Sequence, residues 1–174
     1  VAAAALAAFQ KTGMTSVTVL KDISYGSNAF DSCASLVSVT VEEGVTEIGN
    51  YMFQNTKLTS VTLPNSVTKI GASAFNGCSL TTINFGQGVK TIENSAFQNC
   101  GELTEIILPD ATETLGQNAF GDCPKLAKIS LGKNMKTLEA YCFVGYSKGC
   151  PLLGDIICRA TTPPTLKDDY GTGP

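Results

Sequence analysis

Hydrophobic and polar residues follow a unit that returns every 22 to 23 residues along this chain, and residues 58–78, LTSVTLPNSVTKIGASAFNGC, show that unit most clearly. The unit begins with apolar residues at alternate positions, which predicts a short strand. Pro64 and Asn65 then predict a turn, and a second extended piece follows before a compact corner that ends at Cys78. The expected inward positions are Leu58, Val61, Leu63, Val67, Ile70, Ala74 and Phe75.

Two positions of the unit, counted separately, establish the repeat. Phenylalanine recurs at spacings of 21, 23, 22, 22, 23 and 23, as Phe9, Phe30, Phe53, Phe75, Phe97, Phe120 and Phe143. The middle residue of the strand recurs as Val17, Val39, Val61, Ile83, Ile106, Ile129 and Ile156. A unit this small cannot bury its apolar side alone. The sequence therefore predicts a solenoid in which neighbouring coils stack into one continuous core.

The motif L-x-x-I-x-L-P-x-x-V-x-x-I-G-x-x-A-F-x-x-C, notably in residues 58–78 and 80–100, resembles the BspA-type leucine-rich repeat. That repeat occurs in surface and secreted proteins of bacteria and of some parasitic protists. The resemblance covers roughly residues 6–166. It implies a β-rich repeat solenoid, a right-handed leucine-rich-repeat horseshoe or arc with about seven parallel strands on its concave face.

We expect a single domain over residues 1–166, with irregular coils at its two ends because terminal repeats must cover the core. Pro163 and Pro164 lack the N–H groups that a further ladder strand needs, which predicts a stop. The first full coil is one residue short after Val19, and the last carries four extra residues after Phe143. The expected parts are a degenerate cap at 1–13, seven strand-bearing coils at 14–158, a C-terminal stop at 159–166, and a tail or cut end at 167–174.

Composition narrows the classes of partner. The 174 residues are 43% hydrophobic and 16% charged, with a net charge of −3 and an isoelectric point near 4.9. This balance offers no basic surface, so we expect no nucleic acid partner. No apolar run reaches the roughly 18 residues of a transmembrane segment. The opening VAAAALAAF has no basic n-region and is not a signal peptide as it stands.

The cysteines form a ladder along the repeat. Cys33, Cys78, Cys100 and Cys123 each lie three residues after a repeat phenylalanine, where other coils have Thr12, Thr56 and Tyr146. We expect reduced thiols packed under each corner, because free cysteine packs as a small apolar residue. Bridges between ladder neighbours are an open alternative, and Cys150 in the inserted turn, the thiol expected to be most exposed, is a candidate partner for Cys142 or Cys158.

Candidate catalytic chemistry is thin. The chain has no histidine, which is the commonest general base and a frequent zinc ligand. No serine or cysteine lies in a nucleophile elbow or a phosphate-binding loop. The pairs Glu42-Glu43, Asp168-Asp169 and Glu102 with Glu105 are expected to be solvated charge. We therefore expect no enzyme, no cofactor and no metal site.

The outward strand residues form rows across neighbouring coils. In the first four coils these rows hold mostly Ser and Thr, whereas the later coils add charges and two isoleucines. Exposed apolar side chains of this kind favour an interaction site. The alternative is that the C-terminal segment covers the isoleucines. The candidate interaction strip is Thr82, Asn84, Glu105, Ile107, Lys128, Ser130, Asp155 and Ile157.

The expected function is a non-catalytic protein-interaction module. The resemblance implies a cell-surface or secreted bacterial protein that adheres to host or neighbouring-cell proteins, although a fold alone does not fix a ligand. One alternative is a rigid spacer that displays another domain. A glycan-binding module is a second alternative, disfavoured because the chain has no tryptophan and the predicted rows offer no aromatic platform.

Overall fold

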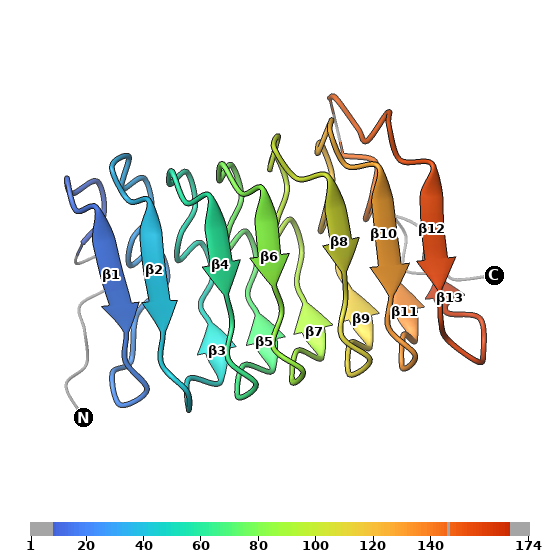
Figure 1. Ribbon diagram of the computed structural model, residues 1–174, viewed down its shortest axis with the longest axis horizontal. Helices are drawn as coiled ribbons and strands as arrows, with labels where there is room; N and C mark the ends of the chain where they lie inside the picture. Colours follow the sequence, from blue (N-terminus) through green and yellow to red (C-terminus); the bar gives the residue numbers. More distant parts are fainter. Residues whose placement is uncertain (1–8, 146, 168–174) are drawn as a thin grey trace.

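The chain winds into a parallel β-solenoid whose coils stack along the long axis of the molecule (Figure 1). The computed structural model describes residues 9–145 and 147–167, and every regular element within them is a β-strand. The long-strand face consists of β1 (Ser16–Val19), β2 (Ser38–Val41), β4 (Ser60–Thr62), β6 (Thr82–Asn84), β8 (Glu105–Ile107), β10 (Lys128–Leu131) and β12 (Asp155–Cys158). The short-strand face consists of β3 (Glu47–Ile48), β5 (Lys69–Ile70), β7 (Thr91–Ile92), β9 (Thr114–Leu115), β11 (Thr137–Leu138) and β13 (Thr165–Leu166). The expected repeat solenoid with seven parallel strands on one face is confirmed.

The two faces differ in the continuity of their hydrogen-bond ladders. The short-strand face is one six-stranded parallel sheet in the order β13-β11-β9-β7-β5-β3. The long-strand face is divided into three sections, β1-β2, β4-β6 and β8-β10-β12. Within the described residues, no ladder joins β6 to β8 or β2 to β4. Two seams therefore interrupt the long-strand face, and the seam between β6 and β8 borders the C-terminal section.

A column of phenylalanine rings forms the centre of the core. Neighbouring rings stack from Phe9 to Phe120 with centroids 5.2–5.5 Å apart. The inner rings, Phe30 to Phe120, are at most 1% exposed. Phe9 is 40% exposed and Phe143 is half-buried, because each lies in a terminal coil. Burial of each inner side chain stabilises the fold by roughly 1.5–3 kcal/mol.

The corner around each phenylalanine contains backbone in the left-handed region. Its first left-handed residue has φ between 53° and 64° in successive coils, at Asn28, Tyr51, Ser73, Ser95, Asn118 and Tyr141. These corners also pair between coils, since Tyr51 N–H donates to Ala72 O at 2.8 Å and Phe53 N–H donates to Ala74 O at 2.8 Å. Inter-coil hydrogen bonds of this kind offset the cost of the left-handed conformation at a non-glycine residue.

The ends depart from the expected pattern in three ways. Within the described residues the first coil has no short strand, because its shortened segment after Val19 runs irregularly to the corner. At the other end the two prolines do not stop the pairing: β13 follows them and pairs with β11, with Thr165 N–H donating to Lys136 O at 2.7 Å. Pro163 and Pro164 lie in the loop before β13, where no ladder N–H is required. Ile156, expected inside, is 53% exposed because β12 is the last long strand. Residues 1–8 of the expected cap and 168–174 of the expected tail lie outside the described residues.

Candidate interaction surface

The parallel register of β8, β10 and β12 brings six of the eight predicted strip residues together. Glu105, Lys128 and Asp155 are partners in one row, and Ile107, Ser130 and Ile157 are partners in the row two residues further along. We call the first row the charged row and the second the isoleucine band. Thr82 and Asn84 are exposed on β6, which pairs with β4 and lies across the seam. The predicted strip is therefore a C-terminal section plus one bordering strand.

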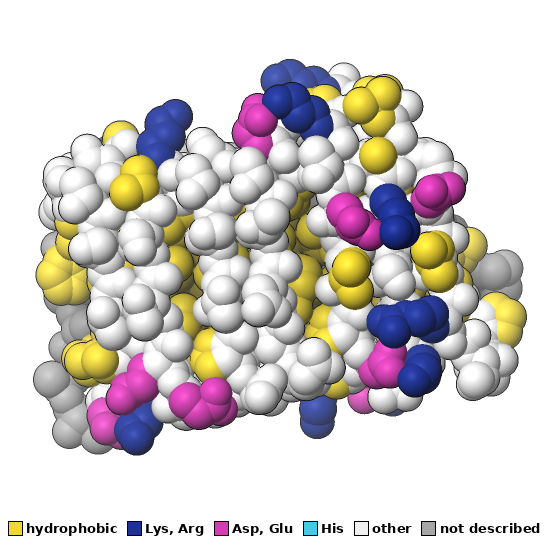
Figure 2. Space-filling model, viewed as in Figure 1, with side chains coloured by type: hydrophobic (Ala, Val, Ile, Leu, Met, Phe, Trp, Pro, Cys, Tyr) yellow, Lys and Arg dark blue, Asp and Glu magenta, His cyan; other side chains and the backbone are white. Residues whose placement is uncertain are grey.

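The isoleucine band is open to solvent. Ile107 is 60% exposed and Ile157 is 45% exposed, so residues 159–167 do not cover them. In Figure 2, two hydrophobic patches lie over the C-terminal strands between two groups of charged side chains, whereas the face over the first strands carries few charges. Exposed branched side chains beside a regular ladder cost solubility without adding to the core. Their position favours a contact surface.

The charged row is internally paired. Lys128 Nζ lies 2.9 Å from Glu105 Oε1, and Asp155 is the ladder partner of Lys128 on the other side. The hydrogen bond to Glu105 and the charge of Glu105 raise the pKa of Lys128, with a further contribution from Asp155. With two carboxylates and one ammonium, the row has a net charge of −1.

A second group of charges lies beyond the other ends of these strands. Asp110 pairs with Lys133 at 2.9 Å and with Arg159 at 3.2 Å, and we call these three residues the basic cluster. The hydrogen bond from Lys133 lowers the pKa of Asp110, and the charge of Arg159 contributes. One carboxylate against two cations gives a net charge of +1.

Sequence reasoning did not include the basic cluster. Asp110 and Lys133 occupy matching places in adjacent coils, 23 residues apart, so the periodicity that revealed the strand rows extends to them. Arg159 lies outside the repeat. Its Nε donates to Leu131 O at 3.1 Å and its Nη2 donates to Leu108 O at 2.9 Å. These contacts hold the guanidinium against coils far earlier in the chain.

The seam between β6 and β8 contains a hollow of about 390 Å³. Its lining includes Ile83, Phe85, Ile107, Pro109 and Arg159. Phe85 occupies an inward position that other coils fill with Val, Leu or Cys, and its ring packs edge-on against Phe97 at 5.7 Å. The hollow borders the isoleucine band and the basic cluster.

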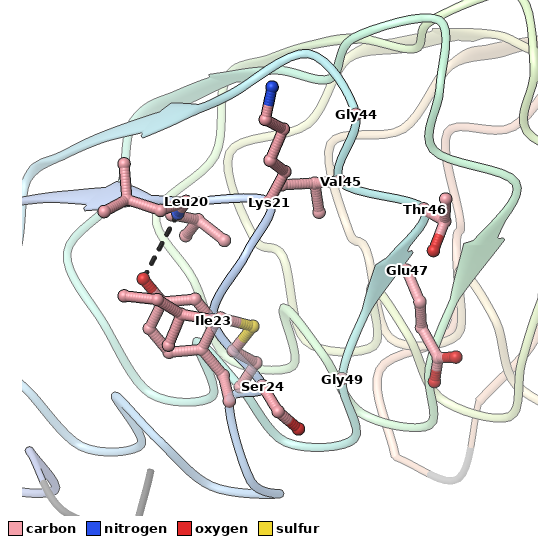
Figure 3. A pocket seen from close by; sticks show the side chains of 12 residues that line it. Leu20, Lys21, Ile23, Ser24, Gly44, Val45, Thr46, Glu47 and Gly49 are labelled. Atoms are coloured by element: carbon pink, nitrogen blue, oxygen red, sulfur yellow. Dashed lines mark hydrogen bonds between the residues drawn. The ribbon is translucent and has the colours of Figure 1, made fainter. Parts of the chain in front are cut away.

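A separate hollow of about 320 Å³ lies at the N-terminal end, where the first coil lacks a short strand (Figure 3). Tyr25 contacts its rim, since its hydroxyl accepts a hydrogen bond from Leu20 N–H at 3.2 Å. In Figure 3 the Lys21 amine and the Glu47 carboxylate point in different directions, so they do not converge on one point. This arrangement gives no focus for binding a charged ligand.

Within the described residues, the acidic side chains that lie close in sequence contact separate partners. Glu42 accepts the Lys21 N–H at 2.9 Å, whereas its neighbour Glu43 accepts the Ser66 N–H at 3.1 Å from another coil. Glu102 pairs with Lys125 at 2.6 Å. Asp168-Asp169 lies outside the described residues. In the part of the chain that the structure describes, no cluster of three or more metal-ligating side chains occurs.

The cysteine ladder is reduced and mostly buried. All of the cysteines are free thiols, and Cys33, Cys78, Cys100, Cys123 and Cys142 are buried. Cys150 was expected to be the most exposed thiol, and this expectation is wrong. It is half-buried, whereas Cys158 is exposed. Cys158 is exposed because it lies on β12, the last long strand.

Comparisons with known proteins agree with this architecture. The family model described as the BspA type leucine-rich repeat region matches the chain in six copies, over residues 6–76 and 23–150. A search of curated proteins finds no match. The described ranges also contain no helix with the length and hydrophobicity needed to cross a bilayer.

Solved structures of bacterial proteins are similar over most of the chain. A leucine-rich repeat protein from Bacteroides ovatus is 30% identical with a TM-score of 0.77, covering 98% of this chain and 44% of its own. A leucine-rich repeat protein from Eubacterium ventriosum is 28% identical with a TM-score of 0.68, covering 91% and 47%. A leucine rich cell surface protein from Faecalibacterium prausnitzii, at 23% identity and a TM-score of 0.69, covers 88% and 50% and shares the fold. This chain spans about half the length of these relatives.

Proposed function

Because this chain belongs to the BspA-type leucine-rich-repeat family, we propose that it is a non-catalytic protein-interaction module of a cell-surface or secreted bacterial protein. Its role is adhesion to proteins of a host or of neighbouring cells. The binding surface is the C-terminal section of the long-strand face together with β6. The family supports the location, and the described surface supports the binding role.

The exposure of Ile107 and Ile157 carries this proposal. Both isoleucines lie at ladder positions that the N-terminal coils fill with threonine, as at Thr18 and Thr40. Threonine at such a position is satisfied by water, whereas an exposed isoleucine gains free energy when a partner covers it. Charged side chains flank the band on both sides and form the polar rim that protein interfaces require.

The size of the surface suits a modest interface. Seven long strands at a spacing of about 4.8 Å make a face roughly 30 Å long. If several coils contribute, the buried area approaches the lower end of specific protein interfaces. We expect a weak to moderate affinity that increases when many copies are displayed on one surface.

The test is binding of the fluorescently labelled chain to intact epithelial cells and to neighbouring bacteria. We expect saturable binding that is lost when the target cells are treated with protease. A quadruple variant, Glu105→Ala, Ile107→Ser, Lys128→Ala and Ser130→Ala, should bind at least about tenfold more weakly, since each change removes exposed contact area or charge.

The matched control is Ser38→Ala, Thr40→Ala, Ser60→Ala and Thr62→Ala, which alters the same rows in earlier coils and should leave binding unchanged. Loss of binding only in this control would place the binding site on the N-terminal coils and would overturn the proposed C-terminal site. Binding that survives protease and disappears after glycosidase treatment would favour the glycan-binding class. If the chain bound to none of these cells, its function as a rigid spacer would be favoured over adhesion.

A further inference from the structure

We propose that the seam between β6 and β8 recognises an extended protein segment that carries one bulky apolar residue between an acidic and a basic residue. This inference rests on the proposed function and names the chemistry of the partner. The apolar residue enters the hollow in the seam, the acidic residue faces the basic cluster, and the basic residue faces the charged row. The segment lies along the direction of β8.

The hollow provides the apolar contact. Ile107 forms one wall at 60% exposure and half-buried Ile83 lies on the opposite strand. Buried Phe85 and Pro109 contribute to the lining. The volume of about 390 Å³ falls near the lower end of the roughly 300–1,000 Å³ of ligand pockets. One Leu, Met or Phe side chain fits such a space, and its burial against these side chains provides the anchor of the interface.

The charges on either side of the hollow have opposite sign. The charged row, at the start of β8, has a net charge of −1 through Glu105, Lys128 and Asp155, while the basic cluster, beyond the end of β8, has a net charge of +1 through Asp110, Lys133 and Arg159. Asp110 lies five positions after Glu105, a span of at most about 17 Å. An extended partner therefore matches both groups when its own charges are four or five positions apart. Complementary charge of this kind selects the orientation of a partner.

Arg159 is held in a binding-competent position before any partner arrives. Its contacts to two backbone carbonyls and to Asp110 fix the guanidinium at the rim of the hollow. Fixing the side chain in advance reduces the entropy lost on binding. The Lys133 side chain is 63% exposed and supplies the accessible positive charge beside it.

The experiment is selection of random twelve-residue peptides, displayed on phage, against the immobilised chain. We expect the enriched peptides to share an apolar residue flanked by one acidic and one basic residue four or five positions apart. A synthetic enriched peptide should lose at least about tenfold in affinity for the Ile107→Asp variant and about threefold for Lys133→Gln. Replacement of both peptide charges by Gln should weaken binding and remove its dependence on salt.

The matched control is Thr62→Asp, which introduces the same charge at the same strand position two coils earlier and should leave affinity unchanged. Ile107 and Thr62 are both exposed, so both variants should keep the thermal midpoint of the parent. Full affinity for Ile107→Asp would overturn the seam proposal, as would enriched peptides that lack the charge pattern or the absence of any enrichment.

Failure of the seam is distinguishable from failure of the proposed function. Peptides that bind Ile107→Asp normally but lose binding to an Ile157→Asp, Lys128→Ala variant would overturn the seam and leave the C-terminal surface as the binding site. Peptides indifferent to all of these variants would overturn both. A chain that sediments as a dimer, and becomes a monomer with Ile107→Asp, would make a second copy the occupant and would overturn the proposed partner.

Discussion

The thiol of Cys150 donates a hydrogen bond to the carbonyl oxygen of Phe120 at 3.2 Å. Cys123 makes the same contact with Phe97 at 3.3 Å, one coil earlier. Cys150 therefore occupies the cysteine-ladder position of the last coil. In the sequence, the residue three positions after Phe143 is Tyr146, and this spacing predicts Tyr146 at that position. Tyr146 itself lies outside the described residues. The four extra residues of this coil precede Cys150, and this placement explains why its thiol is not the most exposed.

Thiol reactivity should follow this ladder. In the native protein we expect Cys158 to be alkylated first, because it is exposed, and half-buried Cys150 to be second. The five buried thiols should react only on unfolding. Timed iodoacetamide labelling followed by peptide mass spectrometry measures the order. Rapid labelling of Cys78, or a disulfide between any two ladder cysteines, would contradict it.

Stability should fall at alkaline pH because of the buried thiols. Burial raises the pKa of Cys78 from 9.0 to about 11 and that of Cys142 to about 12. The folded state therefore keeps protons that the unfolded chain releases. The free energy of unfolding is unaffected below pH 9.0 and decreases between pH 9.0 and about 11, by up to about 1.4 kcal/mol per pH unit for each such thiol.

Urea unfolding at pH 7, 8, 9 and 10 measures this decline. The Cys78→Ala variant should show a shallower decline than the parent, whatever its stability at pH 7. The Thr62→Ala variant, altered at an exposed side chain that does not titrate, should keep the parent slope. Identical slopes for Cys78→Ala and the parent would show that the protonation of this thiol does not differ between the folded and unfolded states, against the prediction.

The ring column should dominate stability in the middle of the solenoid. Phe97 is fully buried and stacks on Phe75 and Phe120 with centroids 5.2 Å away on each side. Phe97→Ala should lower the free energy of unfolding by about 3–5 kcal/mol. Phe9→Ala should cost less, because that ring is 40% exposed. Exposed Thr62→Ala, the control, should stay within about 0.5 kcal/mol of the parent. Similar small losses at Phe97 and Thr62 in urea unfolding would refute the stacked core.

Asp122 should hold the inserted segment of the last coil. Its Oδ1 accepts N–H groups from Ser147 at 2.9 Å and Gly149 at 2.9 Å, and also from Lys148. Asp122→Ala should lower the free energy of unfolding by about 1–3 kcal/mol. It should also accelerate hydrogen exchange at these three amides while the amides of β4 and β6 keep their protection. Glu102→Ala, which removes an exposed ion pair, should cost at most about 1 kcal/mol. Unchanged exchange at residues 147–149 in Asp122→Ala would show that other contacts hold the segment.

The periodic parts of the fold were predictable because each coil contacts only its neighbours. Val61 and Phe75 are inward in the sequence pattern and 3% or less exposed in the structure. The left-handed residues were not predictable in the same way. Gly and Asn indicate positive φ, yet Tyr51 and Tyr141 adopt it. At Tyr51 the backbone N–H pairs with Ala72 of the next coil, which supports the left-handed conformation. The contact that supports this conformation is made by the neighbouring coil, so it cannot be predicted from the type of the residue itself.

The candidate surface likewise has one part that the sequence pattern predicts and another part that it does not. Ile107 and Ile157 could be assigned to one exposed row because alternation in a strand fixes which face a side chain occupies. The seam could not be predicted, because the repeat pattern gives β6 and β8 equivalent positions and does not show that their ladder is interrupted. Arg159 could not be placed either, since it contacts the Leu108 carbonyl across 51 residues and outside the repeat.

The division of the solenoid into parallel ladders also determines how it responds to mechanical load. The strands lie across the long axis, so the hydrogen bonds between coils run along it (Figure 1). Tension between the two ends of the molecule therefore loads these bonds a few at a time, and coils detach in turn. Each detached coil of 22 to 23 residues releases about 7–8 nm of chain. The molecule should extend in a series of equal steps under a pulling tip, and each step should dissipate work as one coil detaches.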